Sequence, residues 1–108
     1  MDVLDKHLDE VVNRYWNYAG RCDDPKDAKL NAALGLAGEA GEVADFFKKY
    51  YYHTAKPFKR EAFVSEMGDV IFYWLKLADL CGVPHTEILE YNRKKLDGRH
   101  PEMNKEGV

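Results

Sequence analysis

The chain is predicted to be an all-α protein, an antiparallel bundle of about four helices in a single domain covering residues 1–108. Apolar residues recur three or four positions apart through long segments, which is typical of amphipathic helices. No segment shows the two-residue alternation of a half-buried strand. A length of 108 residues suits one domain.

The first helix is expected over about residues 2–18, where Val, Leu and Tyr side chains follow the helical spacing. Gly20 and Pro25, among turn-forming aspartates, are expected to end it. A second helix, rich in Ala and Leu, is expected over about residues 29–50 and is followed by the loop "YHTAKPF".

The third helix is expected over about residues 59–80. It should stop at Cys81-Gly82-Val83-Pro84, because Gly just after a helix and Pro beyond it are termination signals. The fourth helix is expected from near residue 86 to about residue 98.

Composition excludes several classes of protein. A net charge of −3 gives no general affinity for nucleic acid or for an anionic membrane. The acidic start "MDVLDKHLDE" is unlike a signal peptide, and no apolar run approaches the roughly 20 residues needed to span a bilayer. Two distant cysteines without a CxxC favour a cytoplasmic location. Because so small a chain buries little surface alone, its many aromatic residues predict self-association.

Two pairs of acids carry the functional prediction. Glu39 and Glu42 in the second helix, and Glu66 and Asp69 in the third, are each three residues apart and therefore share a helix face. Each pair lies at the border of its helix's apolar stripe. Four carboxylates at one helix interface would repel one another at low dielectric. They predict a site for Mg²⁺, with Mn²⁺ as a substitute, because these ions prefer oxygen ligands. The alternative is that they are solvated acids.

Glycines interrupt both acidic segments. A glycine inside a helix costs about 1 kcal/mol relative to alanine. We interpret Gly35, Gly38, Gly41 and Gly68 as positions where a neighbouring helix or a phosphate chain approaches the backbone closely.

The fourth helix offers cations and an amide for phosphate. Asn92 and Lys95 fall within or beside its apolar arc, and Arg99 follows Gly98. They could bind phosphate oxygens, with Arg99 bidentate. Alternatively, Lys95 extends its ammonium to water and Arg99 is an ordinary terminal arginine.

The pattern Glu39-x-x-Glu42, 23 residues, Glu66-x-x-Asp69 resembles the signature of the all-α nucleoside triphosphate pyrophosphohydrolases. The segments "LGLAGEAGEVADFFKK", "EMGDVIFYWLKLA" and "NRKKLDGRHPE" are most similar to its MazG-like branch. The resemblance covers about residues 28–101. It implies antiparallel helices completed by oligomerisation, as a homodimer or homotetramer.

The resemblance also implies an activity, the hydrolysis of (deoxy)nucleoside triphosphates to the monophosphate and pyrophosphate with Mg²⁺. Glu39, Glu42, Glu66 and Asp69 would then be metal ligands. Asn92, Lys95 and Arg99 match a block that contacts phosphates, and Tyr73 matches an aromatic residue near the nucleotide.

Water attacking the α-phosphorus needs in-line geometry, charge neutralisation and a base. Glu39 or Glu42 would take the proton of the water, and the sequence does not choose between them. No Ser, Cys or His is placed as a nucleophile. Base recognition needs aromatic residues such as Trp16, Tyr73 or Phe46, each of which is also an ordinary core residue.

The sequence also bears on two other classes of protein. A ferritin-like di-iron bundle requires Glu-x-x-His motifs, and neither acidic pair has the histidine. A non-catalytic helical module that binds nucleotides, or a protein, remains the alternative function.

Overall fold

A computed structural model describes residues 2–19, 24–52 and 57–102. These residues form helices and no strand, which confirms the all-α prediction. In chain order the elements are α1 (Val3–His7), the π-helical η1 (Leu8–Val12), α2 (Asn13–Tyr18), α3 (Pro25–Tyr52), α4 (Arg60–Leu80) and α5 (His85–Arg99). None of these helices is both long and apolar enough to cross a membrane.

The N-terminal helix begins where expected but changes its hydrogen-bonding pattern midway. Asp2 caps α1 by accepting a hydrogen bond from the Asp5 backbone N–H at 2.8 Å. The π-helical turn η1 separates α1 from α2. Hydrogen bonds in such a turn run from i to i+5, so the residues after it are rotated relative to those before it. Val12 and Trp16 are buried, whereas no residue of α1 is.

Helix α3 begins about one turn earlier than predicted. The side chain of Asp24 accepts hydrogen bonds from the backbone N–H groups of Lys26, at 2.9 Å, and Asp27, at 3.2 Å. Pro25 occupies the first helical position, where its missing N–H costs nothing. The proline that the sequence analysis treated as part of a break therefore starts the helix.

Helix α4 ends at the predicted stop. Gly82 has φ +69°, the left-handed conformation that favours glycine. Its N–H donates to the Asp79 carbonyl at 3.0 Å, and the Val83 N–H donates to the Ala78 carbonyl at 2.9 Å. This is the Schellman pattern, which satisfies the last carbonyls of the helix.

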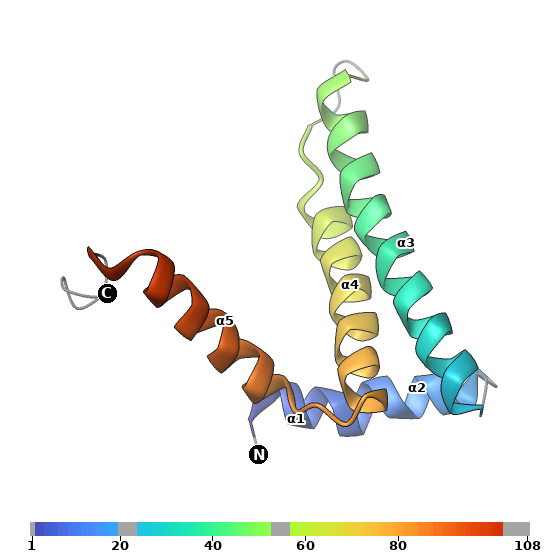
Figure 1. Ribbon diagram of the computed structural model, residues 1–108. Helices are drawn as coiled ribbons and strands as arrows, with labels where there is room; N and C mark the ends of the chain where they lie inside the picture. Colours follow the sequence, from blue (N-terminus) through green and yellow to red (C-terminus); the bar gives the residue numbers. More distant parts are fainter. Residues whose placement is uncertain (1, 20–23, 53–56, 103–108) are drawn as a thin grey trace.

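Figure 1 shows α3 and α4 side by side as an antiparallel pair, with the α1–α2 segment crossing one end of the pair. The core lies at this crossing. Trp16, Ala28 and Ala32 are buried there, and partly buried hydrophobic side chains pack against them: Phe72, Tyr73, Leu77 and Leu80. Lys76 is also buried; its ammonium donates to Asn13 Oδ1 at 2.8 Å and lies 5.2 Å from the centre of the Trp16 ring.

Gly35 sets how closely α3 and α4 approach. A Cβ at this position would lie 2.7 Å from Tyr73 Cζ and closer still to two other atoms of that ring. The interpretation of close helix approach therefore holds at Gly35. It does not hold within this chain at Gly38, Gly41 and Gly68, where an added Cβ meets nothing within 4 Å.

Helix α5 is anchored at its first residue. His85 is 5% exposed, and its Nε2 lies 3.0 Å from Asp5 Oδ1 and 3.2 Å from Asp2 Oδ1. Beyond this anchor, α5 leaves the other helices at an angle, so its C-terminal half lies away from α3 and α4 (Figure 1).

A single chain thus does not close into a compact bundle. Its radius of gyration is 17.1 Å, whereas a compact domain of this length has about 13 Å. Its accessible surface is 8312 Å², whereas about 6,200 Å² is typical of a folded monomer of this mass. Large apolar side chains are correspondingly exposed, among them Val64, Met67, Leu89 and Leu96.

Candidate metal centre between α3 and α4

Three of the four predicted acids meet between the two long helices. Glu39 on α3 and Glu66 and Asp69 on α4 each offer a carboxylate oxygen, and the three oxygens lie within 4.8 Å of one another. The antiparallel pairing that puts Gly35 against Tyr73 brings Glu39, one turn further along α3, opposite Asp69, one turn earlier on α4. The i, i+3 spacing of Glu66 and Asp69 keeps both on the face turned to α3.

The electrostatics of this cluster act on Glu39. Its pKa is raised above the ordinary value of 4.5, first by partial burial and then by the negative charges of Asp69, Glu66 and Glu42. Glu42 is exposed and is not one of the three converging carboxylates, but its charge still reaches Glu39. The described side chains around Glu39 therefore disfavour its ionised form unless a cation is added.

The donor set fits a hard divalent cation. All three groups are carboxylates, which Mg²⁺ and Mn²⁺ favour. Glu39 and Glu66 are half-buried, whereas Asp69 is exposed. One side of the cluster thus stays open to a ligand. Mg²⁺ commonly keeps positions for water and substrate phosphate besides its protein carboxylates.

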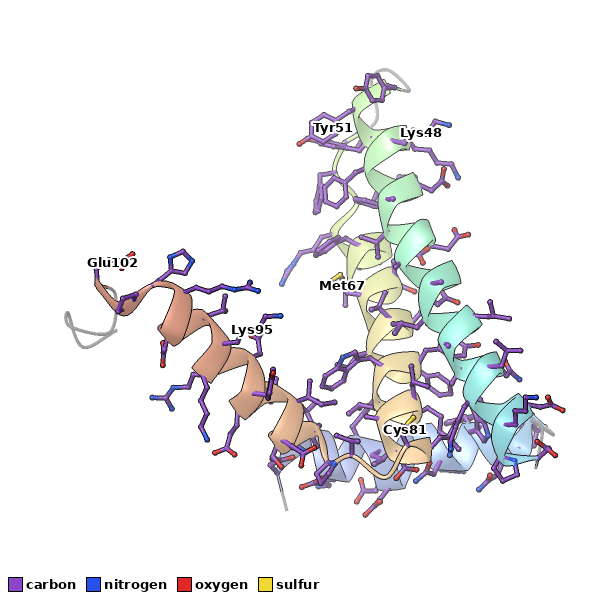
Figure 2. All side chains as sticks on the ribbon, in the orientation of Figure 1. Lys48, Tyr51, Met67, Cys81, Lys95 and Glu102 are labelled. Atoms are coloured by element: carbon purple, nitrogen blue, oxygen red, sulfur yellow. The ribbon has the colours of Figure 1, made fainter. Side chains whose placement is uncertain are left out.

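The predicted phosphate-binding residues lie elsewhere in the chain. Asn92, Lys95 and Arg99 are exposed on α5, and α5 and α3 lie on opposite sides of α4 in Figure 1. In Figure 2, Lys95 and Met67 lie on the sides of α5 and α4 that face each other across the angle between these helices. The folded chain therefore does not bring its own Asn92, Lys95 and Arg99 to the carboxylates.

Two of the three predicted aromatic site residues, Trp16 and Tyr73, are part of the helix packing. Trp16 is 4% exposed within the core, so its ring is not presented to a ligand. The substrate-binding role predicted for Trp16 has no support from this placement. Tyr73 is half-buried, packs against that core and covers Gly35. Tyr73 is thus one turn from Asp69 on the same helix.

Phe46, the third predicted aromatic residue, lines a pocket beyond the acids that the sequence did not predict. A cavity of about 160 Å³ is lined by Phe46, Lys49, Tyr50, Pro57, Lys59 and Ala62. A signal for it was present in the sequence, because Phe46 and Tyr50 follow Glu39 at helical spacings of seven and eleven residues and so share its face.

Comparison with known proteins identifies the family of the chain. Residues 28–104 match the model of the MazG nucleotide pyrophosphohydrolase domain. The chain is also 32% identical over 84 residues to the gene 37 protein of Mycobacterium phage L5, which covers 75% of this chain and 73% of the phage protein. No solved structure matches. Because the matched domain spans most of the chain and both acidic pairs, the chain belongs to the MazG nucleotide pyrophosphohydrolase domain family.

Proposed function

We propose that the chain hydrolyses (deoxy)nucleoside triphosphates to the monophosphate and pyrophosphate, with Mg²⁺ held by the acids between α3 and α4. The observation that carries this proposal is the convergence of Glu39, Glu66 and Asp69 within 4.8 Å. Membership of the MazG family supports the reaction class.

Different side chains are assigned different roles in this reaction. A divalent cation at this site would neutralise the triphosphate charge and polarise a phosphoryl oxygen. Glu39, Glu66 and Asp69 would hold it and so position the phosphate chain. Glu42 is exposed and outside the three-carboxylate group. Of the two glutamates predicted as bases, we therefore assign Glu42 to take the proton of the attacking water.

A substrate panel tests this function. Folded protein with Mg²⁺ is expected to release pyrophosphate from at least one common ribo- or deoxyribonucleoside triphosphate, measured with a coupled pyrophosphate assay. Nucleotide binding without turnover of any member would instead support the non-catalytic alternative and overturn the proposal.

We propose further that the active form is a homo-oligomer, with a homodimer as its smallest unit. The chain exposes about 2,100 Å² more surface than a compact monomer of its mass, and obligate dimers commonly bury 2,000–5,000 Å² in total. Val64 and Met67 are 56% and 47% exposed on α4. A second copy filling the angle beside α4 would cover them, and its α5 would supply the phosphate-binding residues that the first copy's α5 does not bring to its own carboxylates.

Charging this apolar face should separate the subunits. Met67→Glu places a carboxylate where the partner is expected, and an unpaired buried charge is costly. We expect the oligomer to dissociate at micromolar concentration in analytical ultracentrifugation, with pyrophosphate release falling at least about tenfold because each site loses its partner's α5.

The matched control is Glu61→Gln, on the exposed first turn of α4. It should leave both the mass and the rate unchanged. A wild-type chain that sediments as a monomer while fully active would contradict the proposed assembly.

A further inference from the structure

The pocket beside the acids is built from two lysines and two aromatic rings. Its wall is formed by Phe46, Lys49 and Tyr50 from α3, together with Pro57 and Lys59 from the segment leading into α4 and Ala62 from its first turn. The rings are held in place by edge-to-face packing, with the Phe58 ring centre 5.3 Å from that of Phe46 and 5.5 Å from that of Tyr50. Neighbouring rings thus fix the aromatic wall.

The pocket lies further along the row of residues that face each other between α3 and α4, the same row that includes the acids. Along the pair, Gly35 meets Tyr73, Glu39 meets Asp69 and Glu66, and Tyr50 meets Phe58. Phe46 lies seven residues beyond Glu39, and Ala62 lies four residues before Glu66. At 1.5 Å per residue, the near edge of the pocket is therefore about 6 Å from the level of the acids along α4 and about 10 Å along α3. A nucleotide whose phosphates are held at the acids can reach it with its sugar and base.

The volume of the pocket and its hydrogen-bond donors limit which ligands it can bind. Its volume of about 160 Å³ is close to that of an engineered cavity of about 150 Å³ that admits one benzene ring. Aromatic rings suit the flat face of a base. A lysine ammonium donates hydrogen bonds and accepts none, so Lys49 and Lys59 match a ring that carries carbonyl oxygens. Lys49 is held by Asp45 at 2.9 Å, but this exposed pair is weak enough to yield to a ligand.

We propose that this pocket binds the base of the substrate, and that it selects a single-ring base with carbonyl oxygens, uracil or thymine. The inference rests on the proposed function for the position of the phosphates. It assigns Lys49 and Lys59 as specificity-determining residues, which the metal centre itself does not require.

Base selectivity is the first test. Among the deoxyribonucleoside triphosphates with Mg²⁺, kcat/KM is expected to be highest for dUTP and dTTP and at least about tenfold lower for the purines, since a lost hydrogen bond and a poor fit each cost about a factor of ten. Equal kcat/KM across the four bases, or a preference for a purine, would overturn the pocket assignment while leaving the hydrolase proposal standing.

Variants of the pocket are the second test. Lys49→Met and Lys59→Met should each raise KM for dUTP about tenfold with kcat little changed, because the lost contact is made equally in the ground state and the transition state. Lys48→Met is the matched control: Lys48 is the exposed neighbour of Lys49 on α3 and does not line the pocket. The affinity for inorganic tripolyphosphate, which has no base, should not change in the two pocket variants.

Binding measurements distinguish the proposed base pocket from the proposed hydrolase activity. The dissociation constants of non-hydrolysable α,β-imido analogues of dUTP and dATP are measured with Mg²⁺ by calorimetry. A dUTP analogue that binds more tightly, and loses this advantage in Lys59→Met but not in Lys48→Met, supports the pocket even if no triphosphate is turned over. Pocket variants that behave like Lys48→Met would overturn it.

Discussion

Asp69→Asn is expected to lower kcat/KM for pyrophosphate release by about 100-fold or more. Asp69 is one of three carboxylates that meet within 4.8 Å, and changes even to the partners of metal ligands cost about 10–100-fold. The amide keeps the shape of the side chain but removes the negative charge that is proposed to hold the cation. Rates are measured with Mg²⁺ at saturation and compared with Glu61→Gln, an acid-to-amide change on the same helix outside the cluster. A full rate in Asp69→Asn would refute the ligand assignment.

The corresponding acid-to-amide change at Glu39 should weaken metal binding but stabilise the metal-free chain. Without metal, Glu39→Gln is expected to raise the thermal midpoint, because the native charge of Glu39 is opposed by burial and by Asp69, Glu66 and Glu42. Metal affinity should fall in parallel, and it should fall less in Glu42→Gln, because Glu42 is not among the three converging carboxylates. Calorimetry with Mn²⁺ measures both affinities.

The stabilisation from Glu39→Gln should depend on pH. The pKa of Glu39 is higher in the folded chain than its unfolded value near 4.5. At a pH between these two pKa values, the folded state therefore binds more protons than the unfolded state. Ionised Glu39 therefore lowers the stability of the metal-free chain above its folded pKa, and this penalty disappears as the pH falls below 4.5. The difference in thermal midpoint between Glu39→Gln and wild type should be positive at pH 7 and close to zero at pH 4. A constant difference would show that charge is not its cause.

Gly35→Ala is expected to destabilise the chain by about 1–3 kcal/mol, the usual cost of overpacking. The added methyl would overlap the Tyr73 ring, so α3 and α4 must separate or the ring must move. Because Tyr73 lies one turn from Asp69 on α4, activity should fall as well. Chemical unfolding and pyrophosphate release measure the two effects.

Gly38→Ala is the matched comparison, since an added Cβ there meets nothing within 4 Å. This change should stabilise the helix by about 0.5–1 kcal/mol through the better helix propensity of alanine. Equal losses in the two variants would show that Gly35 has no special contact.

Much of this chain could be predicted from short-range pattern. The spacing of apolar residues placed the helices, and the Gly82–Pro84 stop was found because its chemistry is local. Short-range pattern misplaces the start of α3, because Pro25 is typical of a helix break although Asp24 caps the helix over it. The same pattern predicts one regular helix over residues 2–18 and does not predict the π turn at η1.

The sequence by itself determined that Glu39 and Glu42, and Glu66 and Asp69, share faces of two helices, because a helix repeats every 3.6 residues whatever surrounds it. Only the tertiary structure decided which of these acids converge, because that depends on how two helices are paired. Tyr73 packed on Gly35 brings Glu39 to Glu66 and Asp69 and leaves Glu42 exposed. Long-range packing also decided that Trp16 is buried, that α5 leaves the acids and that a pocket opens beside Lys49, none of which local spacing encodes.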